Sequence, residues 1–133
     1  MTPETLDPGG PGIVLNLAGE GEVDNAIDIN SLIFPLRPPE RWARSGRFIQ
    51  ADITALPVRS AVAVEVVGRK LPMMSGGDRL AVAREAVRVL VAGGVLRLHA
   101  SSGGGAIWFP VFEAVGLGAG TLESIHAVGV KPR

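Results

Sequence analysis

Residues 85–96 read EAVRVLVAGGVL, a stretch with a helical pattern that runs through a double glycine into a strand. Apolar side chains recur at helical spacing, and charged side chains take the opposite face. The apolar set is Leu80, Ala83, Ala86, Val87 and Leu90, against Arg84, Glu85 and Arg88. Ser75 and Asp78 are N-cap candidates, and a double glycine favours the end of a helix. The pattern predicts a helix from about Ser75 to the glycines, followed by a strand over residues 95–100.

Further apolar runs lie on both sides of this stretch, separated by short helical or irregular segments. The predicted strands are residues 13–17, 26–29, 47–50, 61–67, 94–100 and 122–130, and the other predicted helices are residues 38–44 and 106–115. Strands that alternate with helices predict an α/β domain with a mostly parallel sheet. Only about ten residues separate Gly19 from Asp28, the lower limit for a crossover, so we expect the first helix to be reduced or missing. Residues 1–12 predict a flexible lead-in to one domain of residues 13–133.

The composition excludes several classes of site. The chain has 133 residues, 47% of them hydrophobic, which is enough for a packed core without cross-links. It has no cysteine, which rules out disulfides and thiolate zinc sites, and its two histidines argue against a histidine-rich metal site. Thirteen basic and thirteen acidic residues cancel, so no broad nucleic-acid-binding charge is indicated. The sequence shows neither a signal peptide nor a membrane span, and we expect a cytoplasmic protein.

Four stretches resemble, in order, the class I S-adenosylmethionine-dependent methyltransferases. They are residues 14–21 (VLNLAGEG), 26–30 (AIDIN), 48–57 (FIQADITALP) and 85–96. The resemblance implies a small Rossmann-like three-layer sandwich whose last strand is antiparallel. It also implies S-adenosylmethionine as cofactor. Gly19 and Gly21 would approach its methionine part, Asp28 would accept the ribose hydroxyls, and Asp52 would accept the adenine amino group.

The chain departs from the family pattern at several of these positions. Asn16 stands where the family carries an aspartate, and Ala63 stands where it often carries an acid. Glu20 and Glu22 crowd the loop that approaches a ligand carboxylate, and no Asn-Pro-Pro-Tyr type acceptor motif is present. Three functions therefore stay open. One is methyl transfer to an unknown acceptor; the others are an inactive binding module, and an effector or toxin domain that acts with a partner protein.

Two catalytic candidates stand near the ends of adjacent predicted strands. Glu65 and His99 could form a pair in which the carboxylate orients an imidazole for general-base catalysis. The alternative is that Glu65 pairs with Arg97 or Arg69 at a partly open sheet face.

Three further segments have a functional and a structural interpretation. Residues 101–105 (SSGGG) could cradle a phosphate with backbone amides, or they are a plain loop. Trp42 lies among arginines and could stack with RNA, although we expect it in the core. Without a first helix, apolar surface beside the first strands needs cover. Residues 32–42, a second copy of the chain or a partner protein would supply it.

Overall fold

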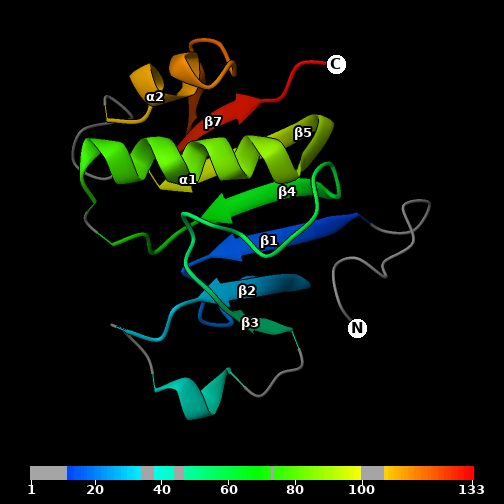
Figure 1. Ribbon diagram of the computed structural model, residues 1–133, viewed down its shortest axis with the longest axis vertical. Coiled ribbons are helices and arrows are strands. Elements are labelled where there is room, and N and C mark those ends of the chain that lie inside the picture. Colours follow the sequence, from blue (N-terminus) through cyan, green and yellow to red (C-terminus); the bar gives the residue numbers. More distant parts are fainter. Residues whose placement is uncertain (1–11, 34–37, 44–46, 73, 100–106) are drawn as a thin grey trace.

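The computed structural model describes residues 12–33, 38–43, 47–72, 74–99 and 107–133, which form one seven-stranded sheet (Figure 1). The strands are β1 (Ile13–Leu17), β2 (Ala26–Asn30), β3 (Phe48–Gln50), β4 (Ala63–Gly68), β5 (Leu90–His99), β6 (Thr121–Glu123) and β7 (His126–Val130). Two α-helices, α1 (Gly76–Val89) and α2 (Phe109–Ala114), and the 3-10 turn η2 (Pro39–Arg41) complete the elements. The strand order is β3-β2-β1-β4-β5-β7-β6. β7 pairs antiparallel with both β5 and β6, and the other four strand pairs are parallel, which confirms the mostly parallel sheet.

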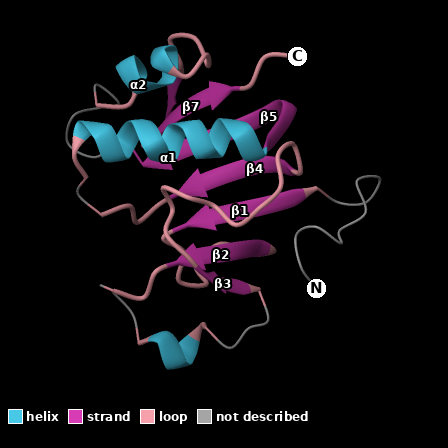
Figure 2. Ribbon diagram, viewed as in Figure 1, coloured by secondary structure: helices cyan, strands magenta, loops and turns pink. Residues whose placement is uncertain are grey.

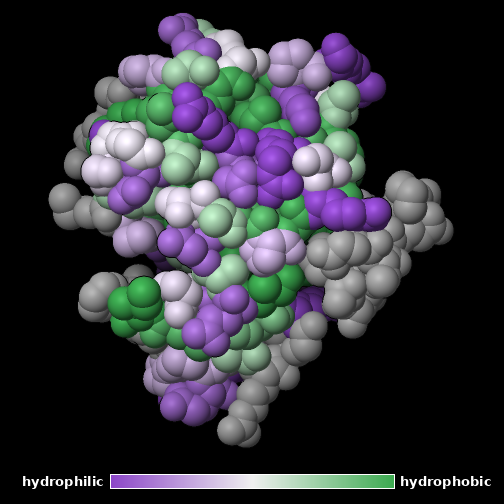
Figure 3. All heavy atoms as spheres, in the orientation of Figure 1, coloured by the Kyte–Doolittle hydropathy of each residue, from purple (hydrophilic) through white to green (hydrophobic). Residues whose placement is uncertain are grey.

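The hydrophobic core lies on the face of the sheet that carries α1 and α2 (Figure 2). Leu15, Val66 and Leu96 lie side by side in register on β1, β4 and β5, and all three are fully buried. Side chains in register point to the same face of a sheet, and this row belongs to one cluster with the buried residues of α1 and α2. The outer surface on this side carries hydrophilic residues over α1 (Figure 3). The Rossmann-like α/β architecture is confirmed, and both described α-helices lie on one face; the second helical layer is not found among the described residues.

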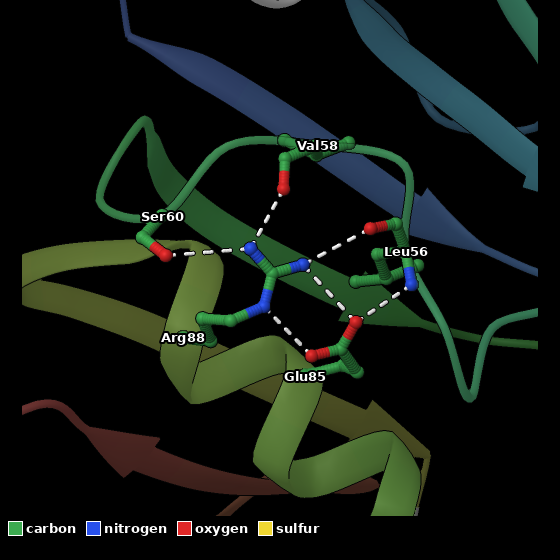
Figure 4. Close-up of polar contacts among 5 residues, drawn as sticks. All are labelled: Leu56, Val58, Ser60, Glu85 and Arg88. Carbon is green, nitrogen blue, oxygen red and sulfur yellow. Dashed lines mark hydrogen bonds and ion pairs between the residues drawn. The ribbon is translucent and has the colours of Figure 1, made fainter.

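The connection between β3 and β4 is tied to α1 by one arginine (Figure 4). Arg88 donates from Nη2 to the carbonyl oxygen of Leu56 at 3.0 Å and from Nη1 to that of Val58 at 2.8 Å. Glu85 accepts from the backbone N–H of Leu56 at 2.8 Å and binds the guanidinium of Arg88. Leu56 and Val58 are buried in the core. Arg88 and Glu85 thus satisfy three backbone groups of this connection.

Residues 18–25 connect β1 to β2 without a helix, as the short spacing predicted. This connection covers part of the face opposite α1, together with Trp42. A Cβ on Gly21 would lie 3.0 Å from the Cβ of Trp42, and the Trp42 ring meets Phe48 edge-on with centroids 5.3 Å apart. Trp42 is buried against Phe48 and the loop after β1, outside the core cluster on the α1 side, and is not an exposed stacking platform. Of residues 32–42, expected to cover the first strands, Ile33 is exposed and Trp42 is buried. Residues 34–37 lie outside the described residues.

The double glycine of residues 93–94 lies inside β5, so the prediction that it ends the helix is wrong. The helix ends at Val89, and Leu90 already has extended dihedral angles and pairs with Ala63 of β4. Gly93 has a φ of +81°, and its N–H donates to the carbonyl oxygen of Lys131 at 2.8 Å. Glycine suits an irregular bend in a strand for the same steric reason that it suits a helix end.

The last predicted strand, residues 122–130, is in fact two strands. β6 and β7 form an antiparallel hairpin around residues 124–125, where Ser124 has a positive φ of 56°. The predicted helix at residues 38–44 is only the turn η2, and α2 begins at Phe109 with Pro110 in its first turn. None of the helices in the described ranges has the length and apolar character of a membrane span.

Candidate functional site

The carboxyl ends of the parallel strands define where a ligand can bind. The chain goes from β1 to β2 on one side and places β4 on the other, so the strand order reverses between β1 and β4. In open α/β sheets the ligand crevice lies at the carboxyl edge beside such a point. Two groups of residues lie at this edge: a polar cluster around the loop after β1, and a cavity beyond β4 and β5.

The polar cluster joins β1, β2 and the loop between them. Asn16 and Asp28 are neighbours in register, and Nδ2 of Asn16 donates to Asp28 Oδ1 at 3.2 Å. The same Nδ2 donates to Glu22 Oε1 at 2.6 Å, and Glu22 Oε2 accepts from the backbone N–H of Glu20 at 2.8 Å. The carboxylate of Glu22 therefore bridges a side-chain donor of β1 and a backbone donor of its own loop.

Gly19 is required by this cluster for steric reasons. A Cβ at this position would overlap the carboxylate of Asp28 and lie 2.7 Å from Asn16 Nδ2. The space above the Gly19 backbone is therefore taken by two side chains of the sheet. Gly19, Gly21 and Asp28 are close together, and Asp28 is only 3% exposed.

The cluster holds three carboxylates: Asp28 and Glu20 are buried, and Glu22 is partly buried. Burial raises the pKa of Asp28, and the nearby Glu22 and Glu20 add to this, while hydrogen bonds from the Gly21 N–H and from Asn16 lower it. The Glu20 side chain is 3% exposed, and its Oε1 lies 3.9 Å from Lys70 Nζ. This lysine follows β4 and supplies positive charge beside the acidic loop.

Asp52 lies at the same sheet edge, just after β3, and its side chain is exposed. Its Oδ1 accepts from the backbone N–H of Thr54 at 2.8 Å and from the Thr54 hydroxyl at 2.7 Å. These two hydrogen bonds lower the pKa of Asp52, and burial opposes them weakly. In this structure Asp52 stabilises its own turn.

Glu65 and His99 are not brought together. Arg97 donates from Nε to Glu65 Oε1 at 2.8 Å and from Nη1 to Glu123 Oε1 at 3.0 Å. Glu65 is in register with Val95, and His99 is four residues further along, roughly 13 Å at the usual rise per strand residue. The alternative interpretation of Glu65, an ion pair at a partly open sheet face, is the one that the structure shows.

A cavity of about 180 Å³ lies beyond the carboxyl ends of β4 and β5. Its polar lining is Arg69, Arg79 and His99, and its apolar lining is Leu71, Pro72, Met74, Ile107 and Trp108. The sequence pointed to Arg69 and His99 but missed Arg79. Arg79 is the fourth residue of α1, and a positive charge there is unfavourable because the N-terminal end of the helix dipole is positive. This unusual position was the sequence signal that could have pointed to Arg79. Residues 101–105, the predicted phosphate loop, lie outside the described residues.

His126 lies close to the positive charges beside this cavity, and its pKa is lowered. It lies opposite His99 on β7, with ring centroids 6.1 Å apart. Burial lowers the pKa of His126, and Arg69, His99 and Arg97 lower it further. The two ends of the ligand edge thus differ in charge: acidic side chains crowd the loop after β1, and cationic side chains line the cavity after β4.

Comparison with solved structures identifies the fold. No protein-family model matches the sequence, and no curated protein sequence is significantly similar to it. A protein from Methanococcus maripaludis, assigned as an S-adenosyl-L-methionine-dependent methyltransferase, superposes with a TM-score of 0.66 at 12% identity, over 92% of this chain and 78% of that one. A protein from Haloferax volcanii, assigned as a methyltransferase and solved with a methyltransferase activator, gives 0.67 at 12% identity, over 92% and 83%.

A ribosomal RNA methyltransferase from Thermus thermophilus, solved with AdoMet and guanosine, gives a TM-score of 0.61 at 16% identity. This chain is covered over 98% of its length but spans only 38% of that enzyme. At such identities the similarity is one of fold. The resemblance read from the four sequence stretches is therefore confirmed at the level of architecture: the chain has the fold of the S-adenosylmethionine-dependent methyltransferases.

Proposed function

We propose that this chain is a ligand-binding domain built on the methyltransferase fold, and that its loop after β1 does not take S-adenosylmethionine. The observation that carries the proposal is the carboxylate of Glu22. It accepts from Asn16 Nδ2 at 2.6 Å and from the Glu20 N–H at 2.8 Å, and so occupies donors that a ligand carboxylate would need.

The polar groups of this loop do not fit the cofactor. Its methionine carboxylate needs N–H donors, and those of Asn16 and Glu20 are already used by Glu22. Its ribose hydroxyls need an accessible carboxylate, and Asp28 is buried under the loop and bonded to Asn16. The connection over residues 18–25 also lacks the helix N-terminus that helps to hold anionic groups. The occupied donors and the missing helix N-terminus would both weaken the binding of the cofactor.

Calorimetric titration of the full chain with S-adenosylmethionine and S-adenosylhomocysteine tests the proposal. We expect no binding heat up to about 1 mM ligand, a concentration that corresponds to only about 4 kcal/mol of binding free energy. The side-chain amide of Asn16, followed by NMR in the same titration, reports on the cluster directly. A dissociation constant below about 100 μM, together with a shift of that amide resonance, would overturn the proposal.

Methyl transfer from S-adenosylmethionine to an unknown acceptor is the second candidate. It is favoured by the topology shared with the methyltransferases and by Asp52, which is exposed at the carboxyl edge after β3. In that case Gly19, Gly21, Asp28 and Asp52 would bind the cofactor. Asp28→Ala should then weaken binding by about 1.5–3 kcal/mol, because the ribose hydroxyls lose a charged acceptor. An affinity that does not change in this variant would reject the assignment of the pocket.

The expected partner protein or second copy on the sheet stays a proposal. On the face opposite α1, Arg97 and its two carboxylate partners are partly exposed, and Val130 is more than 40% exposed. Sedimentation of the purified chain at several concentrations tests self-association. A monomer throughout would leave only a different protein as the partner.

A further inference from the structure

The cavity beyond β4 and β5 combines two arginines with an apolar wall. We infer that it binds a small organic anion, a carboxylate or phosphate carried on an apolar body about the size of one ring. The inference rests on the proposed binding function and names the class of ligand. It concerns a site separate from the Gly19 loop, so each can fail without the other.

Arg79 is the better fixed of the two arginines. Its Nη1 donates to the carbonyl oxygen of Met74 at 2.6 Å, and this bond holds the guanidinium beside the N-terminus of α1. Its Nε is buried and has no hydrogen-bond partner among the described residues. A buried N–H of a charged group is costly to leave without an acceptor. An anion in the adjoining cavity would supply that acceptor.

Arg69 adds a second positive charge from the other side. It follows the last residue of β4 and lines the same cavity as Arg79 and His99. Within the described part of the chain it makes no hydrogen bond or ion pair, and no carboxylate lines the cavity. Glu65 and Glu123, the acids of the neighbouring strands, are held by Arg97. The charge of Arg69 is therefore available to a ligand.

The remaining walls determine what carries the anionic group. Leu71, Met74 and Trp108 present apolar surface, and the Trp108 side chain is almost fully buried. The cavity volume of about 180 Å³ is of the order of the roughly 150 Å³ that holds a benzene molecule in an engineered apolar cavity. An apolar ring fits this volume, and a planar guanidinium binds a carboxylate or a phosphate through two parallel hydrogen bonds. A free inorganic ion would leave the apolar wall uncovered.

The test uses the full chain with four probes: phenyl phosphate, benzoate, inorganic phosphate and the neutral benzyl alcohol. Binding is followed by calorimetry and by the fluorescence of Trp108, the only other tryptophan being Trp42. We expect at least one aromatic anion to bind with a dissociation constant below about 1 mM, and inorganic phosphate to bind about tenfold more weakly or not at all. The two aromatic anions distinguish a phosphate ligand from a carboxylate ligand. Equal binding of benzyl alcohol would overturn the anion assignment.

Three variants locate the site. Arg79→Gln and Arg69→Gln should each weaken the binding of the better anion by about tenfold or more, because each removes a charge-assisted contact. Arg84→Gln, on an exposed position of the same helix, should leave it unchanged. Arg69 makes no hydrogen bond among the described residues, so Arg69→Gln is expected to fold even where Arg79→Gln does not. No binding of either aromatic anion at about 10 mM, or an equal loss in Arg84→Gln, contradicts the inference.

The outcomes also separate this inference from the proposed function. Binding of S-adenosylmethionine that leaves the phenyl phosphate affinity unchanged overturns the proposed function alone. If neither the aromatic anions nor S-adenosylmethionine give a binding heat, the inference alone is overturned.

Discussion

Replacing Arg88 by alanine should destabilise the fold through a loop that is distant in the sequence. Arg88 makes two hydrogen bonds to backbone carbonyl oxygens, those of Leu56 and Val58, about thirty residues earlier in the chain. It also holds Glu85, which accepts from the Leu56 N–H. The variant leaves two partly buried carbonyl groups without their donor and releases the segment that places Leu56 and Val58 in the core.

The expected loss follows from the exposure of each contact. The side chains of Arg88 and Glu85 are 35% and 21% exposed, so their ion pair is screened by solvent and adds only about 0.3–0.5 kcal/mol. The two charge-assisted bonds to partly buried carbonyl groups add about 1–1.5 kcal/mol each. We expect the free energy of unfolding to fall by about 2.3–3.5 kcal/mol, and Tm by roughly 8–12 °C for a domain of this size.

Urea denaturation followed by circular dichroism measures this loss. Arg84→Ala on the exposed face of α1 is the matched control and should stay within about 0.5 kcal/mol of the unsubstituted chain. Arg88→Lys keeps the charge but loses the planar guanidinium that reaches both carbonyl groups, and its stability should lie between those of Arg88→Ala and the unsubstituted chain. A loss in Arg88→Ala no greater than in Arg84→Ala would refute the reasoning.

The pH dependence supplies a second check on the same contact. Hydrogen bonds from Arg88 lower the pKa of Glu85, while burial opposes them. A lowered pKa of an acid stabilises the folded state above the unfolded pKa of about 4.3, and this stabilisation is lost as the pH falls through the folded pKa. The stability gap between the unsubstituted chain and Arg88→Ala should therefore narrow below about pH 4.

Three further predictions concern the polar cluster. Glu22→Ala should lower the free energy of unfolding, measured in urea, by about 1 kcal/mol, because two hydrogen bonds are lost while the repulsion between Glu22 and Asp28 is relieved. Asp24→Ala, at an exposed position of the same loop, should leave the free energy of unfolding unchanged. Burial raises the pKa of Asp28, so the unsubstituted chain should gain stability relative to Asp28→Asn as the pH falls from about 7 to about 4; a gap that stays constant with pH would contradict this. Gly19→Ala should destabilise the fold by about 1–3 kcal/mol through overlap with the Asp28 carboxylate. Gly77→Ala, whose added Cβ would meet only Ser75 Oγ at 3.8 Å, should show no comparable loss.

The sequence by itself determined the features that depend on neighbouring residues. Apolar runs such as Ile13–Leu17 become strands because their side chains need burial on a sheet, and the first strand matches the prediction residue for residue. The absent helix between β1 and β2 follows from chain length, since residues 18–25 are too few for a crossover helix. Order along the chain and connection length also restrict the topology to a few possibilities.

The tertiary structure alone decided which side chains meet and which are covered. Glycine has the same conformational freedom at a helix end and at a strand bend, so only the pairing of β5 with its neighbours placed the double glycine of residues 93–94. Glu65 is bound to Arg97, 32 residues away, because the register of β4 and β5 separates it from His99. Arg79 lines a cavity only because the first turn of α1 lies beside the carboxyl ends of β4 and β5. These outcomes are set by long-range register and packing, which no local pattern encodes, and they determine whether a residue of the right type can bind a ligand.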